Sequence, residues 1–128
     1  MHGRVSPHSA GYVFHRYKSN LYACSLESVQ SYLQAFPNVF YHKGIFPHSV
    51  KKVPENEMFS FAHFDVDLYE STLGCLNFFY PRMNPGGVML SHDYSILHGV
   101  RKAFEEFFED KIEELIELPS TQCMVVKR

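Results

Sequence analysis

The feature that most constrains this chain is an alternation of apolar runs and amphipathic segments from residue 58 onward. The run MFSFAHFDVD, residues 58–67, is too continuously apolar for a strand with one solvated face, which indicates a strand covered on both faces. A helical pattern follows over residues 71–83, then a second apolar strand over 88–93 and a second helix over 99–111. Strands that alternate with helices predict an α/β fold with a mostly parallel sheet.

The length of 128 residues fits a single domain. Residues 1–20 show no sustained periodicity and are expected to form an irregular N-terminal segment, which leaves residues 21–128 as the domain. The remaining predicted elements are a helix with Ser25 as its N-cap that runs to Phe36, a short strand over residues 39–46, and a closing antiparallel hairpin formed by 114–118 and 122–128.

Net charge and cysteine spacing limit the kinds of partner and the cellular compartment that are expected for this chain. A net charge of −2 gives no global basic signal, so neither a nucleic acid nor a membrane is expected as a partner. The three cysteines are isolated and show no C-x-x-C spacing, which favours a reducing compartment and therefore a cytoplasmic location. No apolar run approaches the ~20 residues of a membrane span, and no secretory signal is visible.

Polar side chains follow both central strands. Asp65 and Asp67 end the first strand, and His92 and Asp93 end the second. Ligands bind at the carboxyl ends of strands in open α/β sheets. If the two strands are neighbours, these four side chains meet and could hold a divalent cation with positions left open for substrate. The alternative is that Asp67 and Asp93 simply cap the helices that follow them.

The segment HFDVDLYESTLGCLNFFYPRMNPGGVMLSHDYSILHGVRKAFEEFF, residues 63–108, resembles the macrocin O-methyltransferase family of S-adenosylmethionine-dependent class I methyltransferases. The family pattern has four parts: D-x-D-L-Y-E-S-T, Y-P-x-h-x-P-G-G (h apolar), D-D-Y, and G-V-x-x-A-h-x-x-F-F. They match residues 65–72, 80–87, 92–94 and 99–108, with His92 in place of the first Asp of D-D-Y.

This resemblance implies roles for the strand-end residues. In the family, a magnesium ion on acids at these strand ends binds two neighbouring oxygens of a sugar hydroxyl acceptor and lowers the hydroxyl pKa. Asp65 and Asp93 would be metal ligands, and Asp67 would support them or act as a base. A ligand at His92 would make the site favour manganese or zinc. Alternatively, His92 is a catalytic base that titrates near neutral pH.

The resemblance also implies a cofactor pocket that this sequence lacks in large part. Class I methyltransferases carry a glycine-rich loop after their first strand and an acid at the end of the second. The seven glycines here form no G-x-G, and the only acid before Glu55 is Glu27, on a predicted helix. We therefore expect a partial class I (Rossmann-like) fold that lacks its first two strands. The remaining S-adenosylmethionine contacts would come from Gly44, Phe46 and Asp65, and the chain would be truncated and inactive alone.

Two further functions stay open, together with one structural expectation. A D-x-D that ends a strand also occurs in metal-dependent glycosyltransferases that use nucleotide sugars, and a non-catalytic interaction module would not need the cofactor loop.

Without the first two strands, residues 59–67 become an exposed sheet edge through which copies of the chain could associate. We expect residues 39–46 to pair along that edge, because their backbone groups also need partners.

Overall fold

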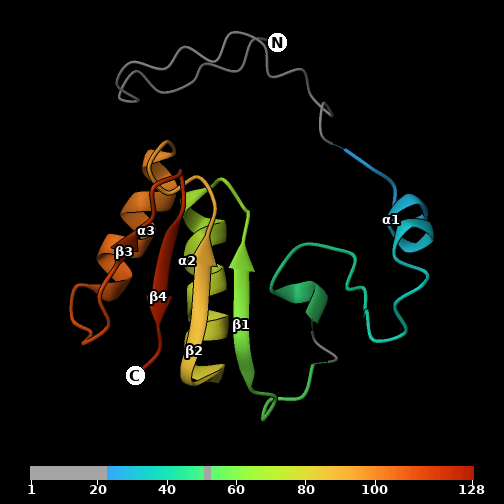
Figure 1. Cartoon of the computed structure of the whole chain (residues 1–128), viewed down its shortest axis with the longest axis horizontal. Coiled ribbons are helices and arrows are strands. Elements are labelled where there is room, and N and C mark those ends of the chain that lie inside the picture. Colours follow the sequence, from blue (N-terminus) through green and yellow to red (C-terminus); the bar gives the residue numbers. More distant parts are fainter. Residues whose placement is uncertain (1–22, 51–52) are drawn as a thin grey trace, which may run out of the picture. The chain divides into compact units, whose positions relative to one another are not determined.

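The computed structural model describes residues 23–50 and 53–128, and the chain divides into two units, residues 1–43 and 44–128. The irregular segment predicted over residues 1–20 lies outside the described residues. In the first unit, helix α1 (Leu26–Tyr32) begins where it was predicted, because the Ser25 hydroxyl accepts a hydrogen bond from the Ser28 N–H at 3.1 Å (Figure 1).

The first unit differs from the prediction after this helix. Helix α1 ends at Tyr32 instead of Phe36, and a turn follows in which the Phe36 N–H donates to the Leu33 carbonyl. Phe36 precedes Pro37, and a residue before proline disfavours the helical conformation. The strand predicted over residues 39–46 is wrong, since none of these residues joins a strand. Gly44 has a φ of 140°, which also departs from strand geometry.

The second unit contains every strand among the described residues. In chain order its elements are a short 3₁₀ helix (His48–Val50), β1 (Phe59–Phe64), α2 (Tyr69–Phe79), a second 3₁₀ turn (Tyr80–Arg82), β2 (Met83–Ser91), α3 (His98–Phe108), β3 (Ile116–Glu117) and β4 (Cys123–Val126) (Figure 1). No helix in the described part of the chain is both long and apolar enough to cross a bilayer.

The sheet of this unit has the strand order β1-β2-β4-β3 and is mixed. β1 and β2 are parallel, whereas β4 is antiparallel to both β2 and β3. The predicted mostly parallel sheet is thus corrected to a mixed one, while the predicted closing hairpin is confirmed. The reason is that β4 returns from the β3 hairpin and inserts between β3 and β2, so one reversed strand makes two antiparallel pairings.

The N-P-G-G segment, residues 84–87, lies within β2. Its pairing with β1 is irregular, because the register shifts between Phe59 and Phe61. Gly86 has a φ of 79°, which favours glycine. At Gly87, a Cβ atom would lie 2.8 Å from the Asn84 carbonyl oxygen, so a side chain cannot fit there without movement. The two glycines therefore let the chain turn and still join the sheet.

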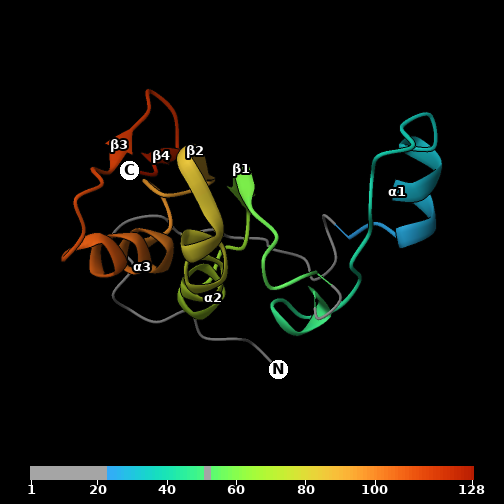
Figure 2. The ribbon, with the colours of Figure 1, turned by 90° about the horizontal axis from the view of Figure 1, so that it is seen from below.

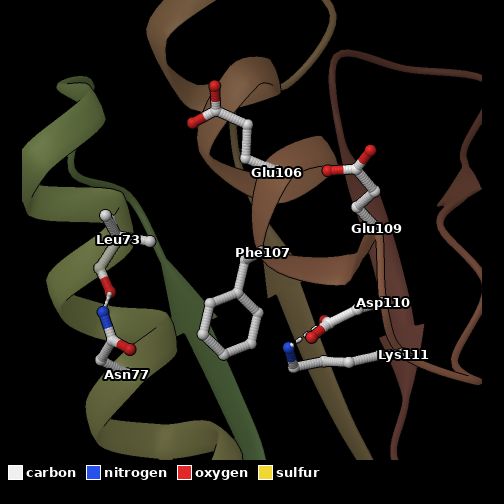
Figure 3. A pocket seen from close by; sticks show the side chains of 7 residues that line it. All are labelled: Leu73, Asn77, Glu106, Phe107, Glu109, Asp110 and Lys111. Atoms are coloured by element: carbon white, nitrogen blue, oxygen red, sulfur yellow. Dashed lines mark hydrogen bonds and ion pairs between the residues drawn. The ribbon is translucent and has the colours of Figure 1, made fainter.

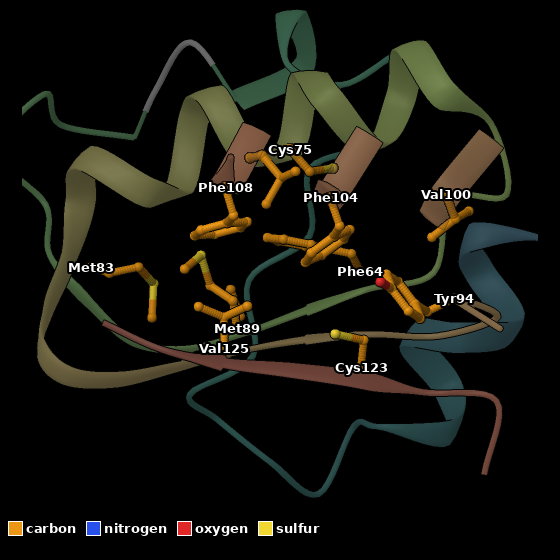
Figure 4. Close-up of a cluster of buried hydrophobic side chains, with 12 residues drawn as sticks. Phe64, Cys75, Met83, Met89, Tyr94, Val100, Phe104, Phe108, Cys123 and Val125 are labelled. Atoms are coloured by element: carbon orange, nitrogen blue, oxygen red, sulfur yellow. The ribbon is translucent and has the colours of Figure 1, made fainter. Parts of the chain in front are cut away.

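Helices α2 and α3 both pack on one face of the sheet (Figure 2). Phe104 of α3 is fully buried and contacts the rings of Phe64 and Phe108. Figure 4 shows the core that these elements share; its buried residues are Ala62, Phe64, Cys75, Leu76, Met83, Met89, Tyr94, Val100, Phe104, Phe108, Cys123 and Val125. They come from β1, β2, β4 and both helices, and Tyr94 comes from the loop after β2, so the helices fix the sheet ends that carry the polar residues.

β1 is an edge strand, as the sequence predicts, and among the described residues it pairs with β2 alone. The expectation that residues 39–46 would pair along this edge is therefore wrong. Phe61 of β1 is 59% exposed, whereas its neighbours Ala62 and Phe64 are buried against the helices. Because side chains alternate along a strand, Phe61 and His63 lie on the face that α2 and α3 do not cover. The prediction that this strand is covered on both faces is therefore wrong, because the helices cover only the face that carries Ala62 and Phe64.

Candidate metal centre

The carboxyl ends of β1 and β2 lie side by side. β1 ends at Phe64 and β2 at Ser91, and these two residues are register partners. One step further, the His92 N–H donates a hydrogen bond to the Phe64 carbonyl at 2.8 Å. This pairing places Asp65 beside His92 and Asp93, so the prediction that the two strand ends are neighbours is confirmed.

Three of the four predicted side chains converge. His92 Nδ1 lies 3.1 Å from Asp93 Oδ2 and 3.6 Å from Asp65 Oδ1. Each of the three residues offers a ligand atom within 4.8 Å of the other two. Ligands bound at ~2.1 Å from a common ion are roughly 3.0–3.4 Å apart when they are adjacent, so two of these separations are close to those of a shared cation.

An unsatisfied atom supports this arrangement. His92 Nδ1 is buried and makes no hydrogen bond of acceptable geometry, although the Asp93 carboxylate is near it. A buried polar atom without a partner is costly. A cation bound by Asp65, His92 and Asp93 would give the His92 Nδ1 atom a partner, so these three residues fit a divalent ion.

Asp67 lies beside the three-residue cluster but is not part of it. Burial raises the pKa of the Asp67 carboxyl, and the negative charges of Asp65 and Asp93 raise it further, while His92 opposes them. Asp67 and Asp93 also share an unusual backbone, with φ values of 45° and 54°. Neither caps a helix, since the N-cap residues of α2 and α3 are Leu68 and Leu97, so the capping alternative is wrong.

Buried neighbours hold the loop around Asp93. Ser91 is 1% exposed and its hydroxyl donates to the His92 carbonyl, while Tyr94 is 2% exposed and packs edge-on against Phe104. The Asp93 carbonyl accepts from the Leu97 N–H at 2.9 Å. Sequence reasoning missed Ser91 and Tyr94 as anchors. The available signal was position, because Ser91 shares the helix-facing side of β2 with Met89.

The other predicted site residues lie outside the cluster. Phe46 packs against Phe78 and Phe79 of α2, with ring centroids 5.2 and 5.7 Å away. A cofactor contact by Phe46 or Gly44 thus stays a prediction. His63 is exposed, and its ring centroid lies 6.3 Å from that of His92, which makes it the neighbour of the cluster on β1.

A shallow hollow of about 470 Å³ lies elsewhere, between α2 and α3 (Figure 3). Its lining residues are Leu73, Asn77, Glu106, Phe107, Glu109, Asp110 and Lys111. The hollow is wide open to solvent, and its one cation, Lys111, already contacts Asp110 at 2.8 Å. We therefore place the candidate site at the strand ends, where ligand atoms converge, and not in this hollow.

The described fold is an α/β fold with a mixed four-stranded sheet, and it is similar to that of a known methyltransferase. The solved structure of the O-methyltransferase NovP matches with a TM-score of 0.70 and 24% sequence identity, over 80% of this chain and 45% of that chain. This chain thus spans less than half the length of NovP, and at that identity the likeness shows the fold alone. The family model of macrocin-O-methyltransferase (TylF) matches residues 3–126, and the chain belongs to this family.

Two further comparisons add little. The apo structure of CalS11, a TDP-rhamnose 3'-O-methyltransferase of calicheamicin biosynthesis, matches at a TM-score of 0.47 and 20% identity, over 78% of this chain and 37% of that chain. This likeness is too weak to carry an argument. None of the curated proteins compared matches the sequence. The predicted resemblance to the macrocin O-methyltransferase family is nevertheless confirmed by the family model.

Proposed function

We propose that this chain supplies the metal-binding and acceptor-binding part of an S-adenosylmethionine-dependent O-methyltransferase that acts on a sugar-like hydroxyl. One observation carries the proposal. In a member of the macrocin-O-methyltransferase family, Asp65, His92 and Asp93 bring three ligand atoms to the adjoining ends of two parallel strands. Such a site leaves coordination positions for two neighbouring oxygens of an acceptor.

In this proposal, Asp65, His92 and Asp93 hold the cation. A bound divalent cation lowers the pKa of a hydroxyl that coordinates it, which favours deprotonation near neutral pH. The three protein ligands orient the acceptor, because they come from two strand ends joined by a backbone hydrogen bond and cannot move independently.

We assign the proton transfer to Asp67. Burial raises the pKa of its carboxyl, which lies beside the ligand cluster, and a carboxylate with a raised pKa is a stronger base. His92 is the other potential base. Its Nδ1 atom lies next to two carboxylates that could share a cation with it, and we therefore assign it the role of ligand.

Calorimetry with a simple glycoside tests the proposal. We expect methyl α-rhamnoside, which carries neighbouring hydroxyls, to bind the full chain with Mg²⁺ or Mn²⁺ present and not after the ion is chelated. Asp65→Asn should weaken this binding at least ~10-fold, by loss of a metal ligand. Asp110→Asn is the matched control, because Asp110 is 83% exposed and lies outside the cluster. Equal binding without the ion, or unchanged binding in Asp65→Asn, would contradict the proposal.

A further inference from the structure

We infer that the cluster of Asp65, His92 and Asp93 prefers a first-row transition-metal ion that accepts an imidazole nitrogen, such as Mn²⁺ or Co²⁺, over Mg²⁺. The inference rests on the proposed function only in taking this cluster as the cation site. It concerns the third ligand, His92, which stands where the family pattern has a carboxylate. The ion that occupies the site decides how strongly a bound hydroxyl is activated.

The geometry assigns a particular nitrogen of His92 to the ion. Nδ1 lies 3.6 Å from an Asp65 oxygen and 3.1 Å from an Asp93 oxygen, and it is buried without a hydrogen-bond partner. The backbone of His92 is fixed on both sides, since its N–H bonds the Phe64 carbonyl and its carbonyl accepts from Ser91. These bonds fix the main chain at the point from which the ring extends, and Nδ1 lies toward both carboxylates, as expected of a ligand.

The chemistry of this donor set disfavours Mg²⁺ in two ways. Mg²⁺ is a small, hard ion that takes oxygen ligands, whereas imidazole suits later first-row metals. Three carboxylates would carry a formal charge of about −3, but two carboxylates and a neutral imidazole carry about −2, so the electrostatic attraction is weaker. Replacing a carboxylate ligand by imidazole weakens the binding of Mn²⁺ and Co²⁺ less than that of Mg²⁺, because their bond to the imidazole nitrogen offsets part of the lost attraction.

Competition between ions tests this preference directly. Metal-free full chain is titrated with Co²⁺, followed by its visible absorption, and then with Mg²⁺ as competitor. In His92→Asp, which restores the carboxylate of the family pattern, the ratio of the Mg²⁺ Kd to the Co²⁺ Kd should fall at least ~10-fold below that of the wild type. His48→Asn, a histidine outside the cluster, should leave the ratio unchanged. An unchanged ratio in His92→Asp would overturn the inference.

A spectroscopic measurement on the unaltered chain keeps the test independent of how the variant folds. Electron spin-echo spectra of bound Mn²⁺ should show coupling to a directly bound nitrogen, and bound Mn²⁺ without that coupling would also overturn the inference. The outcomes separate this inference from the proposed function. If Mg²⁺ binds as tightly as Co²⁺ and binding depends on Asp65, only the metal preference fails. If no ion binds in an Asp65-dependent way, the cation site itself fails.

Discussion

At the scale of single residues, the backbone of the two loop aspartates is the least ordinary feature. Asp67 and Asp93 each lie just after a parallel strand, and each has a left-handed conformation. For an L-residue this conformation costs roughly 1–2 kcal/mol, and aspartate and asparagine tolerate it best. Residues held in such conformations cluster at functional sites, so the strain agrees with the placement of the site at these loops.

A pair of substitutions separates backbone strain from charge at Asp67. Asp67→Ala and Asp67→Asn both remove the negative charge that Asp65 and Asp93 oppose, but only asparagine tolerates the φ of 45°. We expect Asp67→Ala to be less stable than Asp67→Asn by about 1 kcal/mol. Urea unfolding measures the difference. Equal stability of the two variants would mean that the loop relaxes and stores no strain.

The site could be predicted from the sequence only in part. That Asp65, His92 and Asp93 meet follows from the strand-end rule, because two apolar strands each end in polar residues. That Asp67 stands apart from the ligand cluster depends on a left-handed turn, which aspartate adopts only in some contexts. Sequence alone also could not tell which nitrogen of His92 lies near the carboxylates, and its role as ligand or base stays a prediction.

A second residue-scale feature is the buried charge of Glu113. Its carboxylate is 0% exposed and accepts hydrogen bonds from Lys127 Nζ at 2.8 Å, the Tyr80 hydroxyl at 3.0 Å and the Arg128 N–H at 3.2 Å. Burial raises the pKa of this carboxyl, but the hydrogen bonds from Lys127 and Arg128 outweigh burial and lower it to about 2.

This lowered pKa predicts a specific acid sensitivity. Because Glu113 has a lower pKa folded than unfolded, its ionised form stabilises the fold above about pH 4.5, and this stabilisation is lost as the pH falls toward 2. The loss is on the order of 2–3 kcal/mol. Glu113→Gln should lower the unfolding free energy at pH 7 and flatten its dependence between pH 4.5 and 2. Chemical denaturation between pH 4.5 and 2 measures the unfolding free energy. If that free energy depends on pH as steeply in the variant as in the wild type, Glu113 is not the cause of the acid sensitivity.

At the scale of elements, we expect replacement of glycine by alanine to affect stability differently in α2 and in α3. A Cβ at Gly74, within α2, would meet nothing within 4 Å, whereas a Cβ at Gly99 in α3 would lie 3.2 Å from the Tyr69 backbone nitrogen. We expect Gly74→Ala to stabilise the fold by about 0.5–1 kcal/mol, because alanine is the better helix former. Gly99→Ala should not stabilise the fold, because its methyl group would push the first turn of α3 away from the first turn of α2. Thermal unfolding compares them, and an equal gain at both positions would show that α3 shifts freely.

Helices and strands could be predicted from the sequence where an apolar pattern of one kind continued over the whole segment. β1, α2, β2 and α3 were all expected, since the two strands are continuous apolar runs and the two helices repeat apolar residues on one face. The strand over residues 39–46 failed, because a strand forms only with a partner, which a local pattern cannot supply. The mixed sheet was missed for a related reason. Where β4 inserts depends on the whole sheet and not on its own sequence.

At the scale of the whole molecule, the outer edge of β1, which has no partner strand in the described part of the chain, predicts self-association. Phe61 is 59% exposed on this strand, which carries no lysine or proline, and uncovered apolar edges pair with other strands. We propose that copies of the chain associate here and expect Phe61→Lys to weaken the association. Sedimentation at several concentrations measures it, with Ile112→Lys, exposed but outside the sheet, as the control. A wild-type chain that stays monomeric throughout would rule the edge out.

Cofactor affinity is the second prediction at this scale. The sequence contains no G-x-G and, before Glu55, no acid other than Glu27. We therefore expect S-adenosylhomocysteine to give no saturable rise in the unfolding temperature of this chain. A clear saturable rise, measured by thermal shift, would mean that another segment supplies the cofactor pocket.

The central claim is that the ends of β1 and β2 form one cation site, and calorimetric titration of the full chain with Mn²⁺ tests it most directly. We expect one saturable site, with binding weakened at least ~10-fold in Asp65→Asn and in Asp93→Asn, because each variant removes a ligand. Asp67→Asn should keep the site, since Asp67 lies outside the cluster. Mn²⁺ binding that is equally tight in Asp65→Asn and the wild type would contradict the account.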